Sequence, residues 1–93
     1  RTGEINLRYS YTGPDHLAPA KVYDDGRNTY VQYDAMPSPL PQPYIRSASK
    51  EMVLANYRIN GNQLVINNVT SGFQLRGTDG TLTVYNDSLS DAP

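Results

Sequence analysis

The chain has 93 residues, no cysteine, and a net charge of −1 from 8 basic and 9 acidic residues. A chain of this length forms one small domain with a limited core. Without cysteine it has neither a disulfide framework nor a thiolate metal site. Its basic residues are scattered along the sequence, which argues against nucleic-acid binding because a nucleic-acid site normally leaves a basic stripe.

The start of the chain carries no targeting pattern. It begins at Arg1 without a signal peptide, and no apolar run approaches the length of a membrane span. We therefore expect a piece of a longer protein, with any targeting signal upstream.

The first predicted element is a strand near the N-terminus. Ile5, Leu7, Tyr9 and Tyr11 alternate with polar residues. That period of two is typical of a half-buried strand. A cluster of turn residues beginning at Thr12 ends it.

A β-hairpin is predicted next, around Asp25-Gly26. Asp and Gly tolerate the positive φ of a tight hairpin turn, and Val, Thr and Tyr are enriched on both sides. The arms are predicted at residues 21–24 and 28–34. Asp24 and Asp25 could also begin a calcium loop, but the required alternation of oxygen ligands does not continue, so the turn is favoured.

Four prolines follow at every second position, from Pro37 to Pro43. This spacing predicts an extended surface loop of polyproline-II character. We interpret the loop as a crossover between sheets or a segment that protects a sheet edge. The alternative is a ligand for an aromatic groove.

The second half of the chain reads as further hairpins. The longest apolar run, residues 52–59, predicts one strand that pairs with residues 63–67 through the Asn60-Gly61 turn. A short strand and a third hairpin complete the pattern, at residues 44–46, 73–76 and 82–85.

About eight short strands without a helix of normal length predict an all-β fold, a small antiparallel β-sandwich. We expect one domain over residues 1–93, with a flexible tail at 87–93. Two sheets would bury an apolar set between them. The predicted core residues are Ile5, Leu7, Val22, Val31, Ile45, Val53, Leu54, Ile59, Val65, Phe73, Leu75, Leu82 and Val84.

No residue set indicates catalysis. His16 is the only histidine, and no activated nucleophile motif or metal-ligand spacing accompanies it. A surface loop histidine is therefore favoured over a catalytic base. We expect no enzymatic activity, no cofactor and no bound metal.

The tyrosines leave a binding role open. The chain has eight tyrosines and no tryptophan, and a small sandwich cannot bury all eight. Exposed tyrosines mark a binding face more often than lysines or glutamates do. A carbohydrate- or peptidoglycan-binding module is one interpretation, although no tryptophan is present to anchor a sugar.

Four stretches, in order and at compatible spacing, resemble the C-terminal domain of the TraO/CagX/TrbG family. The family's opening strand, its hairpin signature and two later segments are matched, with Leu64-Val65-Ile66 and Val69 between the last two. The four stretches are Arg8–Gly13, Asp24–Tyr30, Asn56–Gly61 and Phe73–Gly77.

The resemblance implies a β-sandwich without enzymatic activity. It implies a structural subunit of the outer-membrane core complex of a bacterial type IV secretion or conjugation system, located in the periplasm and tied indirectly to the outer membrane. The implied partners are a small outer-membrane lipoprotein, the largest core-complex subunit, and further copies of the full-length protein in a ring. Some relatives join the lipoprotein by a disulfide, so a chain without cysteine would bind it noncovalently.

We expect a lipoprotein segment to add as a strand to an open sheet edge. The opening strand is the favoured edge, because a terminal strand often lies there. Two tyrosines in the resembling motifs are further candidates. The predicted partner-binding residues are Ile5, Leu7, Tyr9, Tyr11, Tyr30 and Tyr57.

Overall fold

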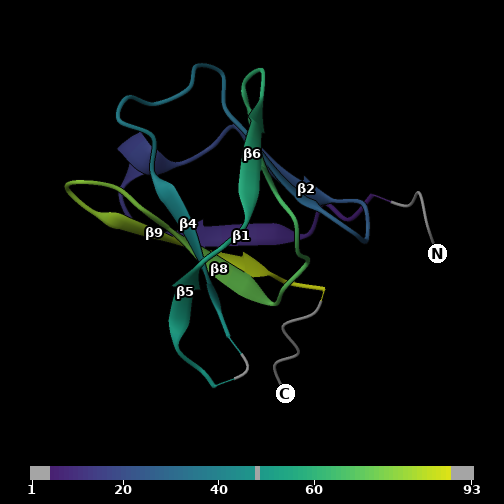
Figure 1. Ribbon diagram of the computed structural model, residues 1–93. Helices are drawn as coiled ribbons and strands as arrows, with labels where there is room; N and C mark the ends of the chain where they lie inside the picture. The colour runs from purple at the N-terminus through teal and green to yellow at the C-terminus, as the bar shows by residue number, and fades with distance from the viewer. Residues whose placement is uncertain (1–4, 48, 89–93) are drawn as a thin grey trace.

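The computed structural model describes residues 5–47 and 49–88, which fold into two antiparallel sheets (Figure 1). One sheet has the strand order β1-β9-β8-β4-β5 and the other β2-β3-β7-β6. Their bounds are β1 (Tyr9–Thr12), β2 (Lys21–Asp24), β3 (Thr29–Gln32), β4 (Gln42–Arg46), β5 (Met52–Leu54), β6 (Tyr57–Asn60), β7 (Gln63–Ile66), β8 (Gly72–Arg76) and β9 (Thr81–Asn86). The prediction of a small antiparallel β-sandwich is confirmed.

The helical content of the described residues is a single 3-10 turn, η1 (Asp15–Leu17). No helix in residues 5–47 and 49–88 has the length and apolarity to cross a membrane. Most of the predicted tail, residues 89–93, lies outside the described residues. The first residue of that tail, Asp87, is bonded to the N-terminal segment, because its backbone N–H donates to the Arg8 carbonyl at 2.7 Å.

The predicted hairpin around Asp25-Gly26 is confirmed as the β2–β3 pair. Gly26 has φ +91°, a conformation that side chains disfavour. The Asp25 carboxylate accepts the backbone N–H groups of Arg27 and Asn28 at 3.0 and 2.9 Å. These bonds lower the pKa of Asp25 below its usual value. The aspartate therefore closes the turn through its own side chain.

The prediction of one strand over residues 52–59 is wrong. β5 pairs with β4 in the five-stranded sheet, whereas β6 pairs with β7 in the four-stranded sheet. The chain changes sheet at two residues: Ala55 donates its N–H to the Pro43 carbonyl at 2.9 Å, and the Asn56 carbonyl accepts the Asn67 N–H at 3.0 Å. A continuous apolar run does not reveal such a change, since both halves remain extended.

The proline segment crosses from β3 in one sheet to β4 in the other, as predicted. It is not wholly a surface loop, however. Pro41 and Pro43 are fully buried, and Pro43 lies within β4. The rings supply apolar surface to the interior, while the Pro43 carbonyl still takes part in the backbone bonding described above.

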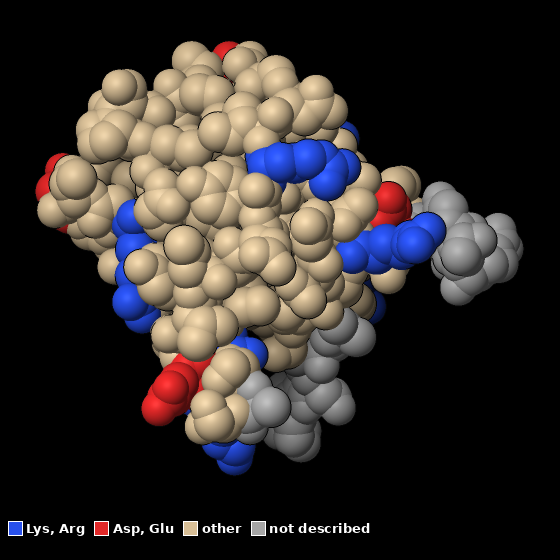
Figure 2. Space-filling view, viewed as in Figure 1, with Lys and Arg blue, Asp and Glu red and all other residues tan. Residues whose placement is uncertain are grey.

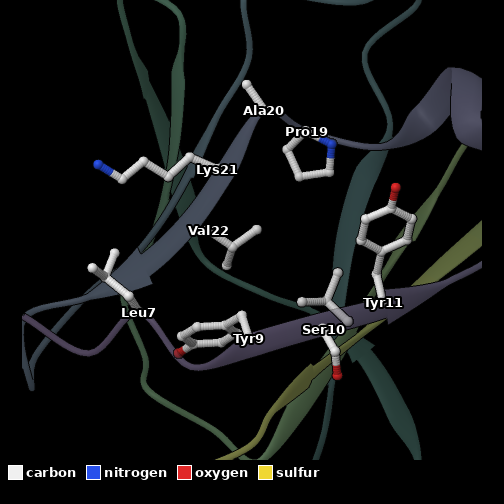
Figure 3. Close-up of a pocket in the computed structure, with 9 residues that line it drawn as sticks. Leu7, Tyr9, Ser10, Tyr11, Pro19, Ala20, Lys21 and Val22 are labelled. Atoms are coloured by element: carbon white, nitrogen blue, oxygen red, sulfur yellow. The ribbon is translucent and has the colours of Figure 1, made fainter.

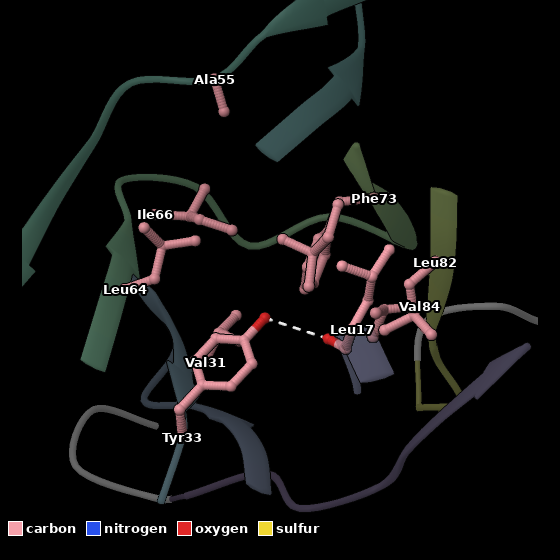
Figure 4. Packing of buried hydrophobic residues seen from close by; sticks show 10 residues of the cluster. Leu17, Val31, Tyr33, Ala55, Leu64, Ile66, Phe73, Leu82 and Val84 are labelled. Atoms are coloured by element: carbon pink, nitrogen blue, oxygen red, sulfur yellow. Dashed lines mark hydrogen bonds between the residues drawn. The ribbon is translucent and has the colours of Figure 1, made fainter. Parts of the chain in front are cut away.

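The core lies between the sheets (Figure 4). Five predicted core residues are buried in the cluster between the sheets: Val31, Phe73, Leu75, Leu82 and Val84. Val65 is also buried, but it lies outside this cluster, opposite Tyr30 in the β3–β7 register. Val22 and Ile45 are partly buried against the core. Five others are exposed, namely Ile5, Leu7, Val53, Leu54 and Ile59. Those five lie in the N-terminal segment or in the short edge strands β5 and β6, where neighbouring strands cover a side chain from one side only.

Five further core residues were not predicted from the sequence, namely Leu17, Tyr33, Ala55, Leu64 and Ile66. Leu17 is the apolar residue of η1 and belongs to the buried core cluster. The Tyr33 hydroxyl donates to the Leu17 carbonyl at 3.2 Å, the dashed line in Figure 4. Burial raises the pKa of Tyr33 to about 12.

A buried polar cluster, Asn6, Tyr9, Asp24 and Asn86, ties the N-terminal segment to both sheets. Asp24 lies in β2 and Asn86 in β9, and they are 4% and 0% exposed. The Asn6 side-chain amide donates to the Asp24 carboxylate and to the Asn86 side-chain oxygen, both at 2.9 Å. The Tyr9 hydroxyl donates to the same Asp24 oxygen at 2.7 Å. One asparagine therefore bridges the two sheets directly.

We predict that Leu64→Ala lowers the free energy of unfolding by about 2–5 kcal/mol, because it opens a cavity in the packed core. Ile59→Ala is the matched control. Ile59 lies opposite Leu64 in the same cross-strand row but is 53% exposed, so we expect a loss below about 1 kcal/mol. Urea unfolding measures both. Equal losses would contradict the assignment of the core.

We also predict an alkaline loss of stability. Burial raises the pKa of Tyr9 and Tyr33, so the folded state holds protons that the unfolded chain releases near pH 10. The free energy of unfolding is then fully retained below pH 10 and falls as the pH rises toward 12, by up to about 1.4 kcal/mol per pH unit for each tyrosine. Urea unfolding at each pH tests this.

Tyr33→Phe should flatten this fall, because it removes one of the two tyrosines whose pKa burial raises. An unaltered slope in Tyr33→Phe would contradict the account.

Candidate partner-binding groove

An open groove of about 240 Å³ lies where an edge strand of one sheet meets an edge strand of the other (Figure 3). β1 ends the five-stranded sheet and β2 ends the four-stranded sheet. We call this feature the edge groove. Its lining residues are Leu7, Tyr9, Ser10, Tyr11, Pro19, Ala20, Lys21, Val22 and Val84.

The expectation that the opening strand lies at a sheet edge is confirmed, but the strand is shorter than predicted. β1 begins at Tyr9. Before it, Asn6 pairs with Asp24 of the opposite sheet, and their backbone groups exchange two hydrogen bonds of 2.8 and 3.1 Å. The alternating pattern of residues 5–11 therefore spans two sheets.

The backbone at both rims offers hydrogen-bonding groups to a further strand. Within the described residues, β1 pairs only with β9, and the outer side of β2 meets only Asn6. Alternate residues of an edge strand direct N–H and C=O groups away from their sheet. The Asn6–Asp24 bridge shows that the β2 edge accepts antiparallel pairing, and this pairing ends where the groove begins.

The side chains of the groove are mainly apolar. Leu7 and Tyr11 are 58% and 44% exposed, and Val22 is half-buried between the two rims. Figure 3 shows Leu7, Val22 and Pro19 around the opening, with Lys21 extending away from it. Lys21 is the one charged residue among the lining residues. The arrangement suits an extended apolar segment.

Tyr9 contributes its ring to the groove and its hydroxyl to the buried polar cluster. Burial and the hydrogen bond to the Asp24 carboxylate both raise the pKa of Tyr9. The hydroxyl is therefore hydrogen-bonded within the domain, and this bond fixes the orientation of the ring at the groove.

The other predicted binding residues lie elsewhere. Ile5 is 52% exposed but does not line the groove. Tyr30 stacks on Tyr23 with ring centroids 4.9 Å apart, and its hydroxyl donates to Asp25 at 3.0 Å. Tyr57 starts the opposite edge strand β6, and its hydroxyl donates to Gln42 at 2.9 Å. The groove therefore combines Leu7, Tyr9 and Tyr11 but neither Tyr30 nor Tyr57.

Val22, Pro19 and Ala20 were missed as groove residues. Pro19 and Ala20 precede β2, and Val22 lies within it. This strand is the first arm of the hairpin that the sequence predicts. That this arm is an edge strand beside β1 follows only from the pairing of strands far apart in the chain.

Among the described residues, the single histidine contacts one carboxylate. His16 is a surface residue, as predicted, and its ring nitrogen lies 3.0 Å from Asp79, with both side chains more than half exposed. This hydrogen bond holds the pKa of the Asp79 carboxyl below its usual value. Within residues 5–47 and 49–88, no three His, Asp or Glu side chains are placed to hold a metal ion. On the face in Figure 2, Lys and Arg are separated by uncharged surface.

The sequence is similar to several proteins named for type IV secretion or conjugal transfer. It is 29% identical to the type IV secretion system protein PtlF of Bordetella pertussis, over 98% of this chain and 35% of PtlF. It is 28% identical to the protein virB9 of Agrobacterium fabrum, over 87% of this chain and 27% of the relative. It is 31% identical to the probable conjugal transfer protein TrbG of Sinorhizobium fredii, over 68% of this chain and 24% of the relative.

The sequence comparisons cover most of this chain but only part of each relative. The chain spans about a third or less of the length of these curated relatives. The sequence model of the CagX family, described as conjugal transfer protein, matches residues 1–87. Since this match includes nearly all of the chain, the chain belongs to the CagX family of conjugal transfer proteins.

Proposed function

We propose that this domain is a non-enzymatic structural part of the outer-membrane core complex of a type IV secretion system and that it binds a small outer-membrane lipoprotein in the edge groove. The family match and relatives named for type IV secretion and conjugal transfer support the role in secretion. One observation supports the mode of binding: two open strand edges, one from each sheet, line the same apolar groove.

A partner strand in the groove would have both backbone and side-chain contacts. It would continue on the β2 edge beyond Asn6, or pair with the outer edge of β1. Its apolar side chains would cover Leu7, Tyr11 and Val22. Full burial of a leucine-sized side chain is worth about 1.5–3 kcal/mol, so these residues supply most of the affinity that we expect.

The wider assignment belongs to the same proposal. In the whole protein we expect a periplasmic location at the outer membrane, contact with the largest core-complex subunit, and self-association in a ring. We expect no nucleic-acid binding by this domain. The lipoprotein contact would be noncovalent, because the chain has no cysteine.

The carbohydrate- or peptidoglycan-binding alternative stays a prediction. Its best platform is the Tyr23–Tyr30 pair on the outer face of the four-stranded sheet. The two rings stack on each other, and the Lys21 ammonium lies 5.3 Å from the Tyr23 ring centroid. Protein groups thus cover ring faces that a sugar would need, so lipoprotein binding is the better supported function.

We predict that Leu7→Asp weakens binding of the mature lipoprotein segment encoded in the same gene cluster by about tenfold or more. The reason is that the substitution removes an apolar contact and places a charge in the groove. Isothermal titration calorimetry measures the dissociation constants. Ile59→Asp is the matched control, because Ile59 is similarly exposed, 53% against 58%, but lies on the edge strand β6.

Amide spectra of both variants establish that they are folded. If folded Leu7→Asp binds like the unaltered domain, or if both variants weaken equally, the groove is not the binding site.

Strand addition is tested separately with a peptide N-methylated at alternate residues. The peptide methylated in one of the two registers should lose binding, because it lacks the N–H donors that face the domain.

A further inference from the structure

The outer face of the five-stranded sheet has a second hollow, of about 230 Å³, on the side of the sheet that faces away from the core. Side chains of four strands surround it. They are Arg46, Met52, Gln74, Thr83 and Tyr85, with Gly72 at the floor. This hollow goes beyond the function proposed above, which uses the inter-sheet edge of the domain.

Gly72 leaves one position beside the hollow without a side chain, and a Cβ there would lie 3.0 Å from the Val84 carbonyl oxygen. Gly72 pairs with Tyr85 on β9, and the register of β4 with β8 brings Arg46 to its other side. Met52 pairs with Arg46 on the next strand. Every other position in this cross-strand row therefore carries a side chain, and the glycine leaves a gap between Tyr85 and Arg46. Tyr85 is 39% exposed at its rim.

The charge of this face differs from that of the domain as a whole. The chain carries −1, yet the outward-facing positions of β4, β8 and β9 include two arginines and neither Asp nor Glu. The carboxylate beside this set is that of Asp87, directly after β9, which accepts a hydrogen bond from Ser10 at 3.2 Å. Arg76 lies 4.2 Å from the Tyr44 ring centroid and donates to Gln74 at 3.0 Å. Arg46 donates to the Lys50 carbonyl at 3.2 Å. Within the described residues neither guanidinium pairs with a carboxylate.

We propose that this face docks an acidic protein segment, with one apolar side chain in the hollow over Gly72 and a neighbouring carboxylate on Arg46. The volume is below the 300–1,000 Å³ of small-molecule sites, and it suits a single side chain. Tyr85 and Met52 supply apolar contact, and Arg46 offers a forked donor that matches a carboxylate. Complementary charge selects an acidic segment over a basic one.

The experiment uses amide NMR of the 93-residue domain and two peptides, acetyl-Glu-Leu-Glu-Leu-Glu amide and the same peptide with Lys at each Glu. We expect the acidic peptide to shift the amides of Gly72, Gln74 and Tyr85, and the basic peptide to leave them in place. Arg46→Glu should weaken acidic-peptide binding on the order of fivefold or more, as expected for reversing one exposed charge pair. Arg58→Glu, which changes an exposed arginine of the other sheet, should not.

Tyr85→Ser provides a second test that keeps every charge, and it should also weaken binding. The proposal is overturned if both peptides shift the same amides, if the acidic peptide shifts only the edge groove, or if no shift occurs at millimolar peptide. It is also overturned if a second copy of the domain covers the hollow. In that case the sedimentation coefficient of the unaltered domain would rise with concentration, and that of Tyr85→Ser would not.

Discussion

The course of the N-terminal segment depends on the side chain of Asn6. Its amide donates to Asp24 in one sheet and to Asn86 in the other, and Tyr9 adds a hydrogen bond to the same carboxylate. Asp24 and Asn86 are nearly inaccessible to water, so leaving them unpaired would be costly. The described residues contain no buried side-chain polar atom without a partner. The cluster thus fixes where the chain leaves one sheet and joins the other.

This crossing creates the edge groove. If residues 5–11 formed one continuous strand, Leu7 would lie within a single sheet beside Tyr9. Instead the chain pairs with β2 at Asn6 and with β9 from Tyr9 onward, and Leu7 lies between the two rims. The core is closed in the middle of the sandwich by Val31, Leu64 and Leu82. The β1–β2 side remains open, as a strand-accepting surface requires.

Local chemistry made much of the fold predictable. The Asp25-Gly26 and Asn60-Gly61 turns set their hairpins through conformations that neighbouring residues already encode. Long-range contacts decided the rest. Residues 52–59 divide between two sheets at Ala55, and Pro43 enters a strand, because their hydrogen-bond partners lie elsewhere in the chain. Tyr9 and Tyr11 were predicted as groove residues because a terminal strand often lies at a sheet edge, whereas Val22 needed the strand order.

The proposed function requires that a partner strand occupies the edge groove. The most direct measurement is a ¹⁵N amide titration of the unaltered domain with the mature lipoprotein segment, followed by hydrogen exchange of the complex. We expect shifts concentrated at residues 7–11 and 19–22, with newly protected amides on β1 or β2. Shifts concentrated on β5 and β6, or binding that protects no edge amide, would contradict the proposed function.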